Sequence, residues 1–228
     1  GNFFWNKSHA QVPVVDDLGN TLRIYYSTRD IKGISRTSFI EVDSDDPKNI
    51  KYVHNDFILD LGDLGNFDES GIMPTCIINH NKKKYLYYIG WSTRSSVPYH
   101  NSIGLAESDD GIFFKKKFNG PIITTNKYEP FFSGTAYVLK ENNFFRIYYL
   151  SCIGWQKFNK KVEPLYNIKY AESKDGVNWN QSGKVAIELK SNEGGLASAS
   201  VIKTEKGYKM WYSYRGKADY RENKKNAY

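Results

Sequence analysis

Aromatic and apolar positions recur along the chain at a nearly constant interval. Two adjacent aromatics close a short strand-like run four times, at Tyr25-Tyr26, Tyr87-Tyr88, Tyr148-Tyr149 and Trp211-Tyr212. These pairs begin 62, 61 and 63 residues apart. An apolar residue stands eleven positions before each second aromatic: Val15, Ile77, Val138 and Val201. A fixed period of this size marks one supersecondary unit used repeatedly, so the pattern predicts four repeats.

β-branched and aromatic residues bounded by Gly, Asn, Asp and Pro predict that these repeats contain only strands. No segment has a convincing helical period over about ten residues. Four strands fit each of the first three repeats: 11–15, 21–27, 36–42 and 57–61; then 71–78, 84–91, 102–107 and 120–124; then 134–139, 145–151, 167–172 and 184–189. Four-stranded units repeated at this size are typical of a β-propeller.

The count of repeats is incomplete. They cover about residues 6–62, 68–125, 129–190 and 192–228, and the last holds only two strands. We therefore expect a single all-β propeller domain over residues 1–228 with about three and a half repeats. Either the chain is a fragment of a longer protein with further blades or domains, or something else completes the ring.

A turn motif recurs between the third and fourth strands of two repeats. It reads Ala106-Glu-Ser-Asp-Asp-Gly111 in one and Ala171-Glu-Ser-Lys-Asp-Gly176 in the next. An aromatic follows each glycine by three residues, at Phe114 and Trp179. Asp-Gly supplies a turn position with positive φ, and the Ser and Asp side chains can accept bonds from nearby backbone N–H groups. We interpret this motif as structural.

Composition narrows the possible partners. The formal charge is +7 and the pI about 9.1, but the lysines stand in turn-like runs among asparagines, which is typical of solvated loops. The sequence shows no RNP, zinc-finger or helix-turn-helix pattern, so we expect no nucleic acid partner. It also shows no apolar run of membrane-spanning length, no signal peptide, no metal-ligand spacing and no glycine-rich phosphate loop. We therefore expect no membrane span, no metal and no cofactor.

The two cysteines bear on the cellular compartment that we expect. Cys76 and Cys152 both lie inside apolar strand patterns and read as small buried hydrophobic residues. Without a disulfide framework or a signal, the default expectation is a reducing cytoplasm.

Several segments together resemble a known group: Gly71-Ile-Met-Pro74, Tyr87-Tyr-Ile-Gly-Trp91, Val97–Ala106, Glu129-Pro-Phe-Phe132, Tyr166–Glu172 and Met210–Arg215. They are similar to the five-bladed propellers of glycoside hydrolase families 43 and 32. The resemblance is strongest to uncharacterised glycosyl-hydrolase-like proteins associated with surface-polysaccharide synthesis. It covers nearly the whole chain and is more specific for the fold than for the reaction.

The resemblance implies carboxylates at the start of the innermost strand of successive blades. Aligned on the apolar positions above, the chain offers the candidates Asp68, Glu69, Glu129 and Glu193. Paired carboxylates can push one pKa upward, as a general acid requires, and their separation decides inversion or retention. Each candidate could instead lie in an ordinary solvated loop. Repeat one departs from the hydrolase pattern, with Asn6, Lys7 and His9 where an Asp is expected.

Eight further residues are candidates for binding a substrate. Arginines follow three second strands, where they could clamp a carboxylate or phosphate or pack between blades. Two tryptophans could stack on a sugar ring or seal contacts between blades. Two histidines and a lysine complete the substrate-binding set, which is Lys7, His9, Arg29, Trp91, Arg94, His100, Trp155 and Arg215.

Two functions remain open at this point. The first is a carbohydrate-active enzyme, a glycoside hydrolase-like or phosphorylase-like protein, that cleaves or transfers a glycosyl unit from a glycan or anionic sugar. The alternative is a non-catalytic glycan-binding propeller module in surface-polysaccharide synthesis, which the missing Asp and the incomplete ring favour. A weaker third hypothesis is a protein-interaction propeller without convergent carboxylates.

Overall fold

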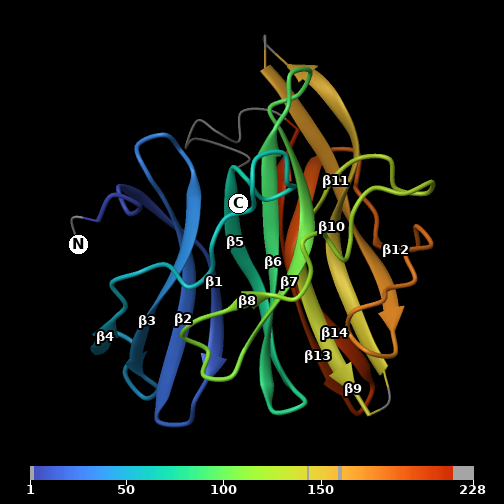
Figure 1. The fold of residues 1–228 in the computed structure, drawn as a ribbon. Helices are drawn as coiled ribbons and strands as arrows, with labels where there is room; N and C mark the ends of the chain where they lie inside the picture. Colours follow the sequence, from blue (N-terminus) through green and yellow to red (C-terminus); the bar gives the residue numbers. More distant parts are fainter. Residues whose placement is uncertain (1–2, 143, 159–160, 218–228) are drawn as a thin grey trace. The chain divides into compact units, whose positions relative to one another are not determined.

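The computed structural model describes residues 3–142, 144–158 and 161–217 (Figure 1). These residues form strands and no helix. The strands are β1 (Ser8–Asp17), β2 (Thr21–Arg29), β3 (Ser35–Asp43), β4 (Ile50–Val53), β5 (Gly71–His80), β6 (Lys83–Thr93), β7 (Tyr99–Ser108), β8 (Lys115–Lys116), β9 (Ser133–Glu141), β10 (Phe144–Phe158), β11 (Lys161–Ser173), β12 (Val185–Ile187), β13 (Glu193–Thr204) and β14 (Gly207–Gly216). Within this part of the chain, no helix exists that could cross a membrane.

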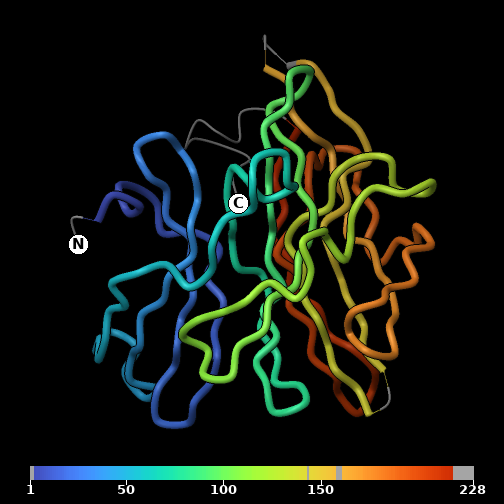
Figure 2. Tube along the Cα trace, viewed as in Figure 1, coloured from blue at the N-terminus to red at the C-terminus, as the bar shows by residue number. Residues whose placement is uncertain are grey.

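The chain divides into two compact units. Unit 1 holds the residues up to Ser92 together with 104–121, and unit 2 holds residues 93–103 and those from 122 onward. One sheet has the order β1-β2-β3-β5-β6-β7-β8 with β4 on β3, and the other has the order β14-β13-β11-β10-β9 with β12 on β11. Figure 2 lets the reader follow each repeat as an antiparallel up-and-down run along the chain.

The strand pairing confirms the alignment of the four repeats. The four aligned apolar residues all face the residue two positions before the second aromatic, in the pairs Val15↔Ile24, Ile77↔Leu86, Val138↔Ile147 and Val201↔Met210. The register also shifts at a bulge between each first strand and its second strand. The recurring pattern is therefore one hairpin geometry used four times.

Within each unit, neighbouring repeats meet through corresponding positions. In unit 1 the Gln11 amide lies 3.3 Å from Met73 Sδ, and both residues stand four before their aligned apolar position. In unit 2 the Ser198 N–H donates to Thr135 Oγ1 at 3.1 Å, and both stand three before theirs. First strands that lie side by side and turn their four-stranded sheets outward are the arrangement of a β-propeller.

The outermost strands differ from the prediction. Residues 57–61 and 120–124 are not strands; the fourth strands are β4 and the two-residue β8. Ile58 and Leu59 lie in a loop, and their apolar side chains are buried in the core of unit 1. The Ile58 N–H donates to Thr37 O at 2.9 Å. Ile123 contributes one isolated bridge to Ile103. Burial alone produced the strand-like pattern there.

The recurrent turn is confirmed as structural. Ser108 Oγ accepts the Gly111 N–H at 2.9 Å, and Ser173 Oγ accepts the Gly176 N–H at 2.9 Å. Both glycines have positive φ, 73° and 71°.

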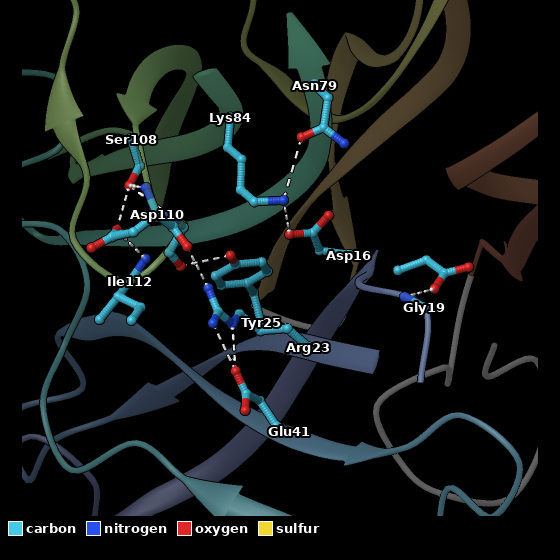
Figure 3. A network of polar contacts seen from close by, with 12 residues as sticks. Asp16, Gly19, Arg23, Tyr25, Glu41, Asn79, Lys84, Ser108, Asp110 and Ile112 are labelled. Atoms are coloured by element: carbon cyan, nitrogen blue, oxygen red, sulfur yellow. Dashed lines mark hydrogen bonds and ion pairs between the residues drawn. The ribbon is translucent and has the colours of Figure 1, made fainter. Parts of the chain in front are cut away.

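In unit 1 two side chains of the preceding repeat donate hydrogen bonds to this turn (Figure 3). Tyr25 donates to Gly111 O at 2.7 Å, and Arg23 donates to Asp110 O at 2.8 Å while pairing with Glu41. A Cβ on Gly111 would lie 2.8 Å from the Tyr25 hydroxyl, so this docking also requires glycine.

Candidate functional site

Two of the four candidate acids share one geometry. Asp68 in unit 1 and Glu129 in unit 2 each stand 20 residues before the second tyrosine of their repeat and accept its hydroxyl. Tyr88 reaches Asp68 Oδ2 at 3.1 Å, and Tyr149 reaches Glu129 Oε1 at 2.7 Å. Both carboxylates are buried, at 0% and 1% exposure.

Each buried acid also faces a lysine. Lys116 Nζ lies 2.7 Å from Asp68 Oδ2, and Lys169 Nζ lies 3.8 Å from Glu129 Oε2. Ser151 donates a further bond to Glu129 at 3.0 Å. A buried charge is tolerated when it is paired and hydrogen-bonded, and these contacts provide both. The two acids are therefore bound within their own repeats.

The tyrosines remain donors in this arrangement. Burial, and then the neighbouring carboxylate, raises the pKa of Tyr88 and of Tyr149 well above the ordinary value. Both hydroxyls thus keep their protons at physiological pH. The 20-residue spacing from acid to tyrosine was visible in the sequence, whereas nothing there marked Lys116 or Lys169 as their partners.

The other two acids sit one residue later and do something different. Glu69 Oε2 accepts the Gly65 N–H at 2.7 Å, and Glu193 Oε2 accepts the Lys190 N–H at 2.8 Å. Both side chains thus cap the loop that precedes a first strand. At the position of Asp68 and Glu129, repeat four carries Asn192.

The positions through which neighbouring first strands touch carry no carboxylate. They are Gln11 with Met73 in unit 1, and Thr135 with Ser198 in unit 2. The described residues also include no group of three or more His, Cys, Asp or Glu side chains that could hold a metal ion.

Four of the substrate-binding candidates lie at one end of the unit 1 strands. We call Lys7, Arg29 and Trp91 the Arg29–Trp91 cluster. The Arg29 guanidinium carbon lies 5.5 Å from the Trp91 ring centroid, and the Lys7 N–H donates to Arg29 O at 2.9 Å. Ser35, which the sequence did not single out, orients the indole by accepting its N–H at 2.7 Å.

Arg29 is incompletely satisfied. Its Nη1 donates to Gly33 O at 3.2 Å, but its buried Nε has no hydrogen-bond partner among the described residues. Those residues also place no carboxylate within ion-pair distance of it. Burial lowers the pKa of Arg29 from its ordinary value, although a guanidinium keeps its charge at physiological pH.

His9, the fourth candidate, lies beside Lys7 at the start of β1. It is exposed, has φ of 65°, and its Nδ1 lies 2.8 Å from Ser8 Oγ. A non-glycine residue in this region is uncommon and marks a position that the surrounding structure constrains.

The three arginines are not equivalent. Trp91 pairs with Gly71 and Arg215 pairs with Gly195, and both glycines stand six before their aligned apolar position. Trp91, not Arg94, therefore occupies the position of Arg215. Arg94 lies beyond the end of β6 and is exposed.

Arg215 is part of the interior of unit 2. It is 1% exposed, donates to the Tyr166 hydroxyl at 2.8 Å and lies over that ring. A Cβ on Gly194 would lie 2.5 Å from Arg215 Nη1, and one on Gly195 would lie 2.3 Å from the Tyr166 ring. The glycine pair thus makes room for these two side chains.

The last two candidates also lie in unit 2. Burial, and then the charge of Arg94, lowers the pKa of His100. Trp155 packs in an aromatic cluster, with its ring 5.5 Å from that of Phe132 and 5.6 Å from that of Tyr99.

Comparison with known proteins shows to which family the chain belongs. No family model matches it. The uncharacterized protein Rv1502 of Mycobacterium tuberculosis strain H37Rv is 31% identical over 223 residues, which are 97% of this chain and 74% of that protein. The uncharacterized protein MT1551 of strain CDC 1551 matches equally. This chain belongs to the family of these uncharacterized mycobacterial proteins.

Solved structures identify the fold of this family member. A glycoside hydrolase superposes with a TM-score of 0.68 at 14% identity, over 90% of this chain and 64% of its own. The Cellvibrio cellulosa α-L-arabinanase complexed with arabinohexaose gives 0.67 at 12% identity, over 93% and 71%. A Bombyx mori family 32 β-fructofuranosidase gives 0.64 at 16%, over 95% and 45%. The chain thus has the β-propeller fold of these hydrolases and spans less than two thirds of the first and last of them.

Proposed function

We propose that this chain recognises a glycan that carries an anionic group, and that the Arg29–Trp91 cluster binds it. The observation that carries the proposal is an arginine with an unpartnered, buried Nε lying against a half-buried tryptophan. An aromatic ring can stack on the apolar face of a sugar, and a guanidinium forms paired hydrogen bonds with a carboxylate or phosphate. The exposed Lys7 and His9 add donors beside them.

The carboxylates support binding rather than proton transfer. Asp68 and Glu129 are buried, and each already has a lysine and a tyrosine hydroxyl as partners. A general acid has to reach the leaving oxygen of its substrate, whereas these two groups are engaged inside their own repeats. Glycan recognition also fits the fold, because a solved neighbour holds arabinohexaose.

Direct binding tests this proposal. Isothermal titration would compare oligogalacturonate and oligoglucuronate with neutral oligosaccharides of the same length. We expect Arg29→Met to weaken uronate binding about tenfold or more through loss of a charge-assisted pair. Arg94→Met is the matched control, because it removes the same charge from an exposed site. Equal effects of the two substitutions, or no uronate binding by the wild type, would overturn the proposal.

Glycosyl cleavage or transfer is the second candidate. It is favoured by the recurrence of a buried acid at one position of two repeats on a fold shared with glycoside hydrolases. Aryl glycosides, with and without phosphate, would measure hydrolysis and phosphorolysis. Turnover that Asp68→Asn and Glu129→Gln abolish, while both variants stay folded, would establish this candidate instead.

A further inference from the structure

The second strand of the fourth repeat has an open edge. In repeat one β2 lies between β1 and β3, and in repeat three β10 lies between β9 and β11. β14 is the corresponding strand of repeat four, and among the described residues it pairs with β13 alone. Its aromatic residues Tyr208, Trp211 and Tyr214 are 43%, 57% and 59% exposed. An unpaired strand edge of this kind is a template for the addition of a further strand.

Repeat one shows which contacts cover such a second strand when the next repeat is in place. Tyr25 on β2 donates to Gly111 O at 2.7 Å, and Arg23 donates to Asp110 O at 2.8 Å, both in the Asp-Gly turn of repeat two (Figure 3). Phe114, three residues after that glycine, packs edge-on against Tyr25 with 5.9 Å between the ring centroids. Tyr25 is fully buried as a result.

Repeat three carries the same side chains at the same positions. Arg146 corresponds to Arg23, and Tyr148 corresponds to Tyr25. Each arginine also lies opposite a glutamate of the third strand, which is Glu172 in repeat three. Here no turn covers the set: the Tyr148 hydroxyl and Arg146 Nη2 have no hydrogen-bond partner among the described residues, and Tyr148 is only partly buried.

We infer that unit 2 has a docking site for a β-strand that ends in a Ser-X-Asp-Gly turn. The strand pairs with the open edge of β14, and the carbonyls of its turn accept hydrogen bonds from Tyr148 and Arg146. The register of repeat three fits this arrangement, because Ser173 stands three residues after Tyr170, which pairs with Tyr148. The same register places the serine of the docked strand three residues after the partner of Trp211.

The occupant is a third strand of the same repeat type. Residues 217–228 contain no Ser-X-Asp-Gly run, and the turn at 108–111 is already occupied within unit 1. The match to Rv1502 covers 74% of that protein, and the rest of its length lies outside the match. These observations favour the third strand of repeat four in a longer polypeptide of this family. The inference does not rest on glycan binding at the Arg29–Trp91 cluster.

A peptide tests this site on the whole chain. The probe is a dye-labelled peptide with the sequence of residues 166–181, which holds a third strand, its Ser-X-Asp-Gly turn and the tryptophan that follows. Fluorescence anisotropy would measure its affinity, and amide chemical shifts would show whether it lies on β14. We expect Tyr148→Phe to weaken binding about fivefold and Arg146→Met about tenfold, through lost hydrogen bonds. Tyr128→Phe, at an exposed tyrosine of the same unit, is the matched control and should leave binding unchanged.

Variants of the peptide test the turn without altering the chain. Gly176→Ala in the peptide puts a Cβ on a residue with φ of 71°, where the corresponding Cβ on Gly111 would lie 2.8 Å from the Tyr25 hydroxyl. This variant should bind about fivefold more weakly or worse. Lys174→Ala, at the variable position of the turn, should bind like the unmodified peptide.

Several results would overturn the inference. They are no binding of the peptide up to its solubility limit, binding away from β14, and binding that neither Tyr148→Phe nor the Gly176→Ala peptide weakens. A dimer of the chain that excludes the peptide would assign the site to a second copy and would overturn it as well. None of these results changes the uronate titration of Arg29→Met, so the docking site and the proposed function can fail separately.

Discussion

Removing the ammonium group of Lys169 tests the account of the buried acids most directly. Lys169→Met keeps the length and the apolar stem of the side chain and deletes its charge. Glu129 would stay buried with two hydrogen bonds, from Tyr149 and Ser151, and with no other ion-pair partner among the described residues.

The expected cost follows from the geometry. At 3.8 Å and an effective dielectric constant of about 20, two unit charges attract by about 4 kcal/mol. Breaking a buried pair on one side typically costs about 3–5 kcal/mol. The two remaining hydrogen bonds offset part of that loss, so we expect Lys169→Met to lower the free energy of unfolding by about 2–4 kcal/mol.

Urea denaturation would measure this change, and hydrogen exchange of the β10 amides would report unit 2 by itself. The double variant Glu129→Gln with Lys169→Met should recover at least about 1.5 kcal/mol relative to the sum of the single changes, because no charge is left buried. Lys203→Met is the control: Lys203 pairs with Glu141 at 3.0 Å but is 64% exposed on its side chain, and such pairs are worth about 1 kcal/mol or less.

Two results would refute the reasoning. One is a Lys169→Met variant no less stable than the Lys203→Met control. The other is additivity of the two single substitutions in the double variant, which would mean that the ammonium and the carboxylate do not interact in the folded chain.

Other consequences of the structure can be checked separately. Burial holds the pKa of His54 below its ordinary value of 6.5, so protonation of His54 favours the unfolded chain. The contribution of His54 to stability should be fully present above pH 6.5 and fall as the pH drops below that value. His54→Phe should flatten this fall in thermal melts recorded between about pH 7 and 5. Gly195→Ala drives a Cβ to 2.3 Å from the Tyr166 ring and should lower the urea midpoint by the equivalent of about 1–3 kcal/mol, whereas Gly154→Ala, with open space around its Cβ, should leave it unchanged. Burial raises the pKa of Cys152 to about 11, so this thiol should resist iodoacetamide at pH 8 until the protein unfolds; rapid alkylation of the native chain would contradict that placement.

The repeating hairpin could be predicted from the sequence alone. The period of the aromatic pairs gave the alignment that the strand register confirms, because strand pairing ties an apolar residue to a partner at a constant distance across a tight turn. The Asp-Gly turns could also be predicted from the sequence, because the hydrogen bonds that hold them join residues within four positions of one another. The 20-residue interval from Asp68 to Tyr88 can likewise be read from the sequence.

Tertiary structure decided what the polar residues do. Glu69 and Asp68 are neighbours in sequence, yet one caps a loop and the other is buried against Lys116, 48 residues away. Gly194 and Gly195, near the start of β13, leave the space that the Arg215 side chain and the Tyr166 ring occupy. Such roles depend on which side chain fills the space beside a backbone, and that space is created by strands distant in sequence. A periodic pattern shows which side chains share one face of a strand. It does not show which residue from a distant strand packs against that face.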